Sequence, residues 1–233
     1  MGGLLIVQTG TTQLHGDYPA WFSRALGREL PVLRAHDGER LKQGLDRVRP
    51  QGIIVTGSPL SVTEQAPWML QLGDDLLRIA ARGTQVLGVC FGHQLLARAA
   101  GGDVVVNPKG REIGTVRVQL TEAGRRDLLF AWAGSGEIEV QATHLDAVDP
   151  LPPGATLLAS NESCAAQAFR LSGTVACVQF HPELWGEAMR DLILSRRDKL
   201  TAEGRDTDAL AAAVRAVEAG KILKSFEIEA LRA

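Results

Sequence analysis

Residues 85–100, QVLGVCFGHQLLARAA, join an apolar run to a helix-like run, and a cysteine flanked by two glycines stands at the junction. A strand that turns sharply into a helix pushes the residue at the turn out of the sheet. Its neighbours must be small because the backbone there is crowded. The positive end of the helix dipole favours a thiolate over a thiol. The stretch therefore predicts a strand, a tight turn and a helix, with Cys90 as a nucleophile at the turn.

A buried structural cysteine is the competing interpretation, because glycine is common in this chain and supplies 25 of its 233 residues. The apolar run before Cys90 and the helical run after it favour the nucleophile, since such a turn requires that context. The other two cysteines, Cys164 and Cys177, are widely spaced and form no CxxC pair. We therefore expect no disulfide framework, no metal site and a cytoplasmic location.

Short β-type runs alternate with helical runs in the first part of the chain. The expected strands cover 4–8, 30–33, 52–56 and 85–89, and the expected helices cover 18–26 and 67–81. This order predicts a parallel sheet with helices on both faces. Strand-like runs follow at 104–106, 114–120, 137–141, 156–159, 166–170 and 174–180, before a helix at 184–197. The predicted fold class is α/β, a three-layer, flavodoxin-like arrangement whose mostly parallel central sheet is flanked by helices and carries an antiparallel or mixed strand extension.

The composition shows no break, so we expect one main domain over residues 1–200. Residues 201–233 are charged and alanine-rich, with apolar residues near helical spacing. They predict a C-terminal helical segment packed on the main domain, with a loose tail as the alternative. Its apolar residues either cover the core or bind another subunit, which leaves a homo-oligomer open. The net charge of −2 indicates no basic face for nucleic acid, and no apolar run approaches the length of a membrane span.

A cysteine nucleophile needs a base, and the base needs an orienting group. His181 follows the apolar run 174–180, and active-site groups gather where parallel strands end. Pro182 stiffens the turn, and Glu183 is placed to accept a hydrogen bond from the imidazole. A surface turn is the competing interpretation of His-Pro-Glu taken alone. Together with Cys90, this segment predicts a Cys90–His181–Glu183 triad.

Four segments carry a resemblance to a known family. Gly-Val-Cys-Phe-Gly-His-Gln at 88–94 and Gln-Phe-His-Pro-Glu at 179–183 resemble the class I, or triad, glutamine amidotransferases. Thr-Gly-Ser-Pro at 56–59 stands where that family has its glycine-rich oxyanion loop. Thr-His-Leu-Asp at 143–146 stands where the family has a Ser-His-Gly-Asp-like segment. The chain looks closest to stand-alone members similar to the amidotransferase domain of GMP synthase.

The resemblance implies hydrolysis of the glutamine side-chain amide to glutamate and ammonia, without a cofactor. Cys90 attacks the amide carbon to form a thioester, His181 transfers the proton, and Glu183 orients His181. Backbone N–H groups of Phe91 and of the loop at Gly57 form the oxyanion hole. The backbone of the segment 143–145 binds the α-amino and carboxylate end of L-glutamine. The implied substrate-binding residues are Gln94, Thr143, His144 and Leu145.

One position departs from the family pattern. Leu145 stands where the family often has glycine, so it is either strained, if φ is positive there, or it reshapes the pocket. Lys-Gly-Arg-Glu at 109–112 also resembles the family, with a solvated charged turn as the alternative. The chain contains no phosphate-binding loop and no Ser-Gly-Gly-Val-Asp-Ser-like ATP segment. We therefore expect ammonia either to pass to a separate synthetase subunit or to be released.

Other functions remain open for the same residues. A γ-glutamyl peptide or amine hydrolase would use the same triad on a different small molecule. A stress-response or intracellular-peptidase-like protein would have histidine directly after the cysteine, where this chain has Phe91. The presence of all three triad residues argues against a binding module that has lost catalysis. A dormant enzyme that needs a partner to complete its oxyanion hole is the remaining alternative.

Overall fold

A computed structural model describes residues 3–134 and 136–232 of the protein. In chain order the strands are β1 (Leu4–Gln8), β2 (Val32–Arg34), β3 (Gly52–Val55), β4 (Gln85–Val89), β5 (Val104–Val106), β6 (Glu112–Leu120), β7 (Glu137–His144), β8 (Asp146–Val148), β9 (Thr156–Ser160), β10 (Ala168–Ser172) and β11 (Val175–Val178). The α-helices are α1 (Tyr18–Leu26), α2 (Leu41–Val48), α3 (Pro67–Ala80), α4 (Phe91–Ala99), α5 (Glu122–Arg126), α6 (Gly186–Ser195), α7 (Arg197–Ala202), α8 (Thr207–Ala212) and α9 (Lys221–Arg232). Short 3₁₀ turns are η1 (Leu14–Gly16), η2 (Ala35–Asp37), η3 (Val62–Glu64) and η4 (Leu128–Phe130).

The central sheet has nine strands in the order β2-β1-β3-β4-β11-β10-β9-β6-β7. The half from β2 to β11 is parallel, and the half from β11 to β7 is antiparallel. Strands β5 and β8 form a separate two-stranded antiparallel sheet. The predicted α/β fold with a mostly parallel sheet and an antiparallel extension is confirmed.

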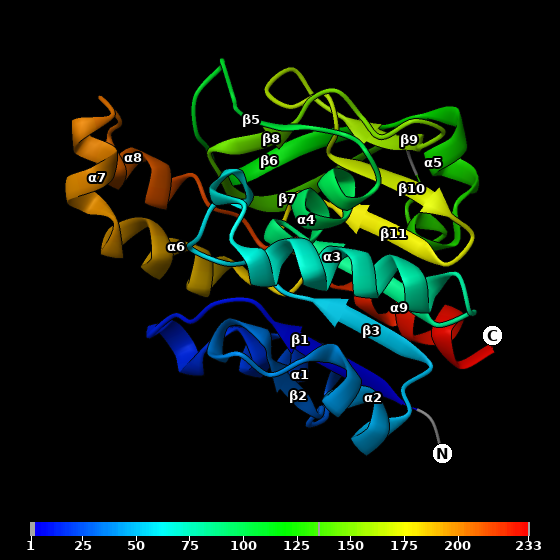
Figure 1. The fold of residues 1–233 in the computed structure, drawn as a ribbon. Helices are drawn as coiled ribbons and strands as arrows, with labels where there is room; N and C mark the ends of the chain where they lie inside the picture. Colours follow the sequence, from blue (N-terminus) through cyan, green and yellow to red (C-terminus); the bar gives the residue numbers. More distant parts are fainter. Residues whose placement is uncertain (1–2, 135, 233) are drawn as a thin grey trace.

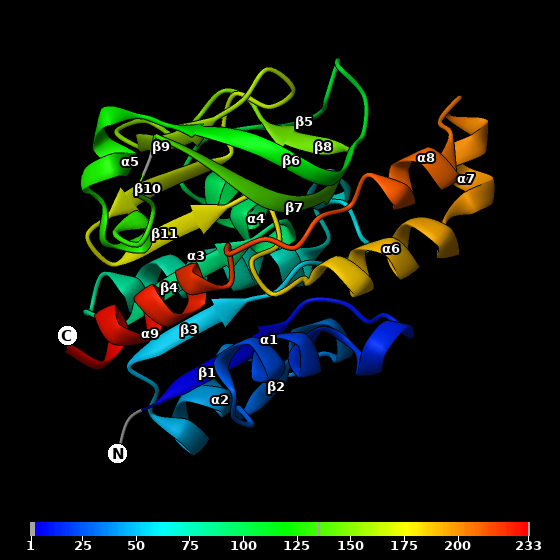
Figure 2. The same cartoon turned by 180° about the vertical axis from the view of Figure 1, so that it is seen from behind.

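Helices cover both faces of the parallel half (Figures 1 and 2). Alternation along β1 sends Leu4 and Ile6 to one face, where they join buried residues of α1 and α9. Leu5 and Val7 point to the other face, where they join buried residues of α2, α3 and α4. Figure 1 shows α3 and α4 in front of the sheet, and Figure 2 shows α1 and α9 on the opposite side. This arrangement gives the three layers expected from the βαβα order.

Among the strands and α-helices, three elements were not expected from the sequence: strand β8 and helices α2 and α5. A glycine inside a short polar stretch lowers helix propensity, and α2 contains Gly44. A Cβ atom there would lie only 2.7 Å from the Leu33 side chain, so the glycine lets α2 lie close against the sheet. Helix α2 is therefore favoured by tertiary packing against a buried strand and not by local propensity.

The C-terminal segment is helical but divided into α7, α8 and α9. Helix α7 ends just before Gly204, whose φ of 73° is left-handed. Helix α9 packs on the sheet, and Ile222, Leu223 and Phe226 are fully buried there. The division of the chain at residue 200 stays a prediction, and the ends of the two predicted segments, at residues 1–2 and 233, lie outside the described residues.

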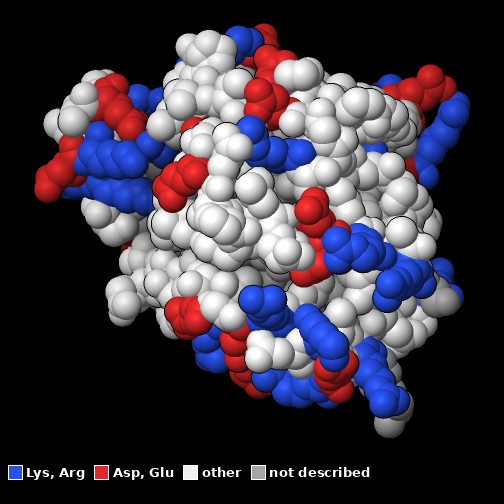
Figure 3. All heavy atoms as spheres, viewed as in Figure 1, with Lys and Arg blue, Asp and Glu red and all other residues white. Residues whose placement is uncertain are grey.

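Charges on the visible surface are mixed in sign. Figure 3 shows lysine and arginine side chains interspersed with acidic ones, including over α7 and α8, and no continuous basic face. None of the helices within the described residues is long and apolar enough to cross a membrane.

The burial of α9 makes a prediction about stability. Replacing the fully buried Phe226 with alanine should lower the free energy of unfolding by about 3–5 kcal/mol, since it removes a large apolar side chain and leaves a cavity. Urea denaturation would measure this loss. The matched control is Ile228→Ala on the same helix, where the side chain is 50% exposed and the cost should stay below about 1 kcal/mol. Equal, small effects of both substitutions would show that α9 contributes little to the core.

Candidate active site

The turn between β4 and α4 has the strained geometry that its sequence predicts. Cys90 has φ 51° and ψ −98°, one of five positive-φ non-glycine residues among those described. A Cβ atom at Gly88 would lie 2.6 Å from the carbonyl oxygen of Gly92. One at Gly92 would lie 2.6 Å from the carbonyl oxygen of Val55. Both glycines are therefore required by close backbone approach, and the cysteine between them is lifted off the sheet at the N-terminus of a helix.

Strand register brings His181 to the same edge of the sheet. Strands β4 and β11 are parallel neighbours in which Val89 pairs with Val178. Cys90 follows the first strand directly, and its N–H donates to the carbonyl of Val178 at 2.9 Å. His181 comes three residues after β11, so both side chains lie where the parallel strands end.

The imidazole of His181 is held by Glu183. Nδ1 of His181 lies 2.7 Å from Oε1 of Glu183, and both side chains are buried. Among the described residues, Nε2 of His181 has no hydrogen-bond partner. The carboxylate thus fixes the ring through one nitrogen and leaves the other nitrogen for a reacting group.

The pKa of His181 is shifted by two opposing effects. Burial by itself would lower it, but the neighbouring Glu183 carboxylate and, after it, Cys90 outweigh burial and raise the pKa of His181 to about 10. The protonated imidazole therefore pairs with the Glu183 carboxylate at neutral pH. Burial raises the thiol pKa of Cys164 and of Cys177 well above its ordinary value, which keeps both thiols unreactive.

The loop after β3 packs closely on the cysteine and the histidine. A Cβ atom at Gly57 would lie 2.8 Å from Cε1 of His181 and 3.7 Å from Cβ of Cys90. The carbonyl of Gly57 accepts hydrogen bonds from the hydroxyls of Thr9 at 3.1 Å and Thr56 at 2.9 Å. In a trans peptide the N–H points opposite to the carbonyl, so the next N–H of this loop, on Ser58, is directed away from these hydroxyls. The loop therefore lies beside the nucleophile with its Gly57 carbonyl already hydrogen-bonded.

A cavity of about 380 Å³ opens over Cys90. The loop 58–61 and the segment 143–146 form part of its wall. The other lining residues are Cys90, Phe91 and Gln94, at and after the turn between β4 and α4, and three cationic residues, Arg111, Arg196 and Lys199. This volume lies within the range of about 300–1,000 Å³ usual for small-molecule sites. Among the residues described, no group of His, Cys, Asp and Glu side chains is arranged to hold a metal ion.

The predicted substrate-binding residues lie in this cavity, but their polar groups are partly engaged. The side-chain amide of Gln94 donates to the Asp146 carbonyl at 2.9 Å and to Gln179 at 3.0 Å. The hydroxyl of Thr143 accepts from Arg196 at 2.6 Å. Leu145 is not among the positive-φ residues, so the strain considered for leucine at this position is absent.

His144 is tied into a buried network. Its Nδ1 lies 2.9 Å from the Asp146 carbonyl, and its Nε2 lies 2.9 Å from Oε2 of Glu112. Burial alone would raise the pKa of Glu112, but hydrogen bonds from His144, Asn161 and Gln167 lower it below its ordinary value. Both imidazole nitrogens are therefore occupied, so the His144 side chain offers no free nitrogen to a ligand. Glu112, the last residue of the Lys-Gly-Arg-Glu segment, thus has a structural role.

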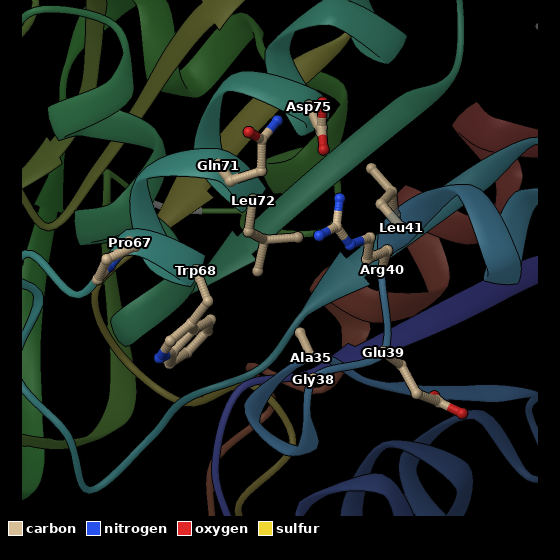
Figure 4. A pocket seen from close by; sticks show the side chains of 10 residues that line it. All are labelled: Ala35, Gly38, Glu39, Arg40, Leu41, Pro67, Trp68, Gln71, Leu72 and Asp75. Carbon is tan, nitrogen blue, oxygen red and sulfur yellow. The ribbon is translucent and has the colours of Figure 1, made fainter.

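A second cavity, of about 410 Å³, is separate from this site. Figure 4 shows Trp68 on one side of it and Arg40, near Leu72, on the other. The Trp68 ring stacks on Phe91, with centroids 6.2 Å apart and planes inclined by 17°. Cys90 lines the smaller cavity and not this one, whereas His181 is among the lining residues of neither.

Three residues near the cysteine carried no signal in the sequence. Arg196 and Lys199 line the cavity from the end of α6 and from α7. Tyr18, at the start of α1, is buried, and burial, with a smaller contribution from Cys90, raises the pKa of its hydroxyl. These residues are far from the motifs in sequence, and only the packing of α1 and α6 beside the sheet brings them to the site.

Comparison with known proteins agrees with this geometry. The family model "Glutamine amidotransferase class-I" matches residues 22–198, and the chain belongs to that family. It is 34% identical over 161 residues to a glutamine amidotransferase-like protein of Schizosaccharomyces pombe, covering 68% of this chain and 63% of that protein. It is 30% identical over 195 residues to gamma-glutamyl peptidase 4 of Arabidopsis thaliana, covering 82% and 75%. The chain thus spans less than two thirds of the S. pombe relative.

The resemblance to GMP synthase is also confirmed. The chain is 34% identical over 185 residues to the glutamine-hydrolysing GMP synthase of Leifsonia xyli, covering 75% of this chain and 36% of that enzyme. A solved glutamine amidotransferase from Thermotoga maritima superposes with a TM-score of 0.79 at 21% identity, covering all of both chains. That likeness shows the same fold.

The His181–Glu183 pair predicts a pH dependence of stability. Below pH 6.5 the imidazole is protonated in both the folded and the unfolded chain, so the pair stabilises the fold fully. Between pH 6.5 and about 10 the unfolded chain loses this proton while the folded chain keeps it, so this stabilisation declines as pH rises. Glu183→Gln should flatten the fall in unfolding free energy between pH 6 and pH 9, as measured by urea denaturation.

The control for this prediction is Asp37→Asn. It removes the carboxylate of a second histidine–carboxylate pair, in which His36 Nε2 lies 3.3 Å from an Asp37 carboxylate that is 61% exposed. Because an exposed pair is screened by solvent, its loss should leave the pH profile close to that of the parent protein. Identical profiles for the parent protein and Glu183→Gln would contradict the raised pKa of His181.

Proposed function

We propose that the protein hydrolyses the side-chain amide of glutamine, or of a related γ-glutamyl compound, through Cys90, His181 and Glu183. The observation that carries the proposal is the buried His181–Glu183 pair, whose free Nε2 lies at the same sheet edge as a strained cysteine. A structural cysteine would need neither the positive φ nor the paired imidazole. The family to which the chain belongs supports the proposal that it is a hydrolase acting on amide C–N bonds.

In the proposed reaction the Cys90 thiolate attacks the amide carbon, and a C–S bond forms. The tetrahedral oxyanion accepts hydrogen bonds from the N–H of Phe91 and from the loop at Gly57. Phe91 is the first residue of α4, where backbone N–H groups have no partner within the helix. His181 gives its proton to the departing nitrogen, the C–N bond breaks, and a thioester remains. His181 then takes a proton from water, which attacks the thioester and releases glutamate.

The fate of the amine product is part of the proposal. In glutamine-hydrolysing GMP synthase the matching region is only part of a longer enzyme, since this chain covers 36% of it. We infer that a separate synthetase subunit accepts ammonia if the substrate is glutamine. A second candidate, hydrolysis of γ-glutamyl peptides, is favoured by the relative named gamma-glutamyl peptidase 4 and by a cavity with three cationic residues.

The nucleophile can be tested by substitution and by labelling. Cys90→Ala should lower ammonia release from glutamine, or amine release from γ-glutamyl amides, by roughly 10⁴–10⁶-fold, because the covalent route is lost. The matched control is Cys164→Ala, whose buried thiol lies outside the cavity and whose loss should leave the rate within about twofold. A glutamine-analogue electrophile such as diazo-norleucine, followed by mass spectrometry, should modify Cys90 alone. Retained activity in Cys90→Ala, or modification only at Cys164 or Cys177, would refute the proposal.

A further inference from the structure

The loop after β3 is tied to the loop after β1 by two threonines that the proposed mechanism does not use. Strands β1 and β3 are parallel neighbours in which Val7 pairs with Val55. Thr9 and Thr56 follow the ends of these strands, at the edge of the sheet where the nucleophile lies. Both residues are fully buried, and the backbone N–H of Thr9 donates to the hydroxyl of Thr56 at 3.1 Å.

The two threonine hydroxyls converge on one carbonyl group. The hydroxyl of Thr56 donates to the Gly57 carbonyl at 2.9 Å, and the hydroxyl of Thr9 lies 3.1 Å from the same oxygen. The Thr9 hydroxyl also lies 3.1 Å from the Thr56 carbonyl, and its one proton serves either oxygen. Thr56 is therefore the principal donor to the Gly57 carbonyl, and Thr9 supports it.

Further contacts hold the two loops together. The hydroxyl of Ser58 donates to the Thr9 carbonyl at 2.9 Å. A Cβ atom at Gly10 would lie 2.5 Å from the Ser58 hydroxyl oxygen, so glycine there lets the loops approach this closely. Rotation of the peptide that follows Gly57 would break the hydrogen bonds to its carbonyl, which lies in the interior of the protein.

The fixed carbonyl decides the direction of the next N–H group. The peptide between Gly57 and Ser58 is trans, so the Ser58 N–H points away from the two threonine hydroxyls. Ser58 lines the cavity over the nucleophile, whereas Thr9 and Thr56 do not. Among the described residues, no hydrogen-bond acceptor lies within reach of the Ser58 N–H. This N–H is therefore a free donor on a residue of the cavity wall.

We propose that Thr56 and Thr9 are positioning residues for the oxyanion hole. Their hydroxyls hold the Gly57 carbonyl in the interior, which turns the Ser58 N–H toward the oxygen that becomes negative during attack by Cys90. Without them the peptide is free to rotate and to place a carbonyl oxygen where the oxyanion needs a donor. The inference rests on the proposed Cys90-dependent hydrolysis and adds that this chain fixes the donor with its own side chains.

Substitution by valine tests the hydroxyls, because valine keeps the shape of threonine and removes its donor. In Thr56→Val, kcat for amide hydrolysis should fall by roughly 10–100-fold, approaching the loss seen when an oxyanion donor is removed outright. KM should stay within about threefold, since the donor acts on charge that develops after binding. Thr9→Val should lower kcat less, and Thr56→Ser, which keeps the hydroxyl, should retain most of the parent rate. The full chain is assayed with L-glutamine and with γ-glutamyl-p-nitroanilide.

Alkylation of Cys90 separates this positioning role from a structural one. Iodoacetamide reacts with a thiolate by displacement at a tetrahedral carbon, so the reaction develops no oxyanion and needs no oxyanion hole. The rate of Cys90 alkylation, followed by mass spectrometry, should therefore be unchanged in Thr56→Val although hydrolysis falls. A substitution that disturbed the turn at Cys90 would change both rates.

Thr174→Val is the matched control. The Thr174 hydroxyl also donates to a backbone carbonyl, that of Ala80 at 3.0 Å. Thr174 precedes β11, however, and so lies at the opposite end of the parallel strands from Cys90. Its substitution should leave both kcat and the rate of Cys90 alkylation at the parent values.

Three results would overturn the inference while leaving the proposed function intact. One is Cys90-dependent hydrolysis at the parent rate in both Thr56→Val and Thr9→Val. Another is a loss in Thr56→Val that Thr56→Ser shares in full, and the third is a parallel fall in alkylation and hydrolysis. If the parent protein hydrolyses neither substrate faster than Cys90→Ala does, the proposed function fails, and the inference with it.

Discussion

The backbone at Cys90 is the constraint on which the rest of the site depends. A φ of 51° in a residue with a side chain is unfavourable by about 1–3 kcal/mol, and it persists only where the surroundings enforce it. Here the turn joins β4 to α4, and α4 lies close to β3. A Cβ atom at Gly92 would lie only 2.6 Å from the carbonyl oxygen of Val55. A larger residue at either flanking glycine would push the helix away from the strand and take the thiol with it.

The parallel pairing of β4 with β11 supplies the second requirement. It places the cysteine and the His181–Glu183 pair at one sheet edge although they lie far apart in the chain. The antiparallel half of the sheet then contributes β7, whose end brings the segment 143–146 over the same edge. Glu112 fixes that segment through His144. The parallel half thus carries the proposed chemistry, and the antiparallel half carries the wall against which a substrate would lie.

Much of this arrangement could be predicted from local patterns. The alternation of strands and helices gave the parallel half, and the ends of β1, β4, α1 and α3 agree with their predicted ranges to within one residue. Helix α2 and strand β8 were missed because a glycine-containing polar stretch and a three-residue strand carry weak periodicity. The C-terminal helix was expected, but its division into three was not, since Gly204 alone does not specify where the chain turns.

The sequence by itself determined the turn at Cys90, the alternation of strands and helices that predicts a parallel sheet, and the His-Pro-Glu turn, because strand, turn and helix signals act over a few neighbouring residues. Only the tertiary structure decided the charge of the cavity, the partners of His144 and the φ of Leu145. It also placed Arg196 in the wall of the cavity that opens over the nucleophile. The physical reason is that burial and pairing depend on strand register and helix packing, which join residues separated by many positions in the chain.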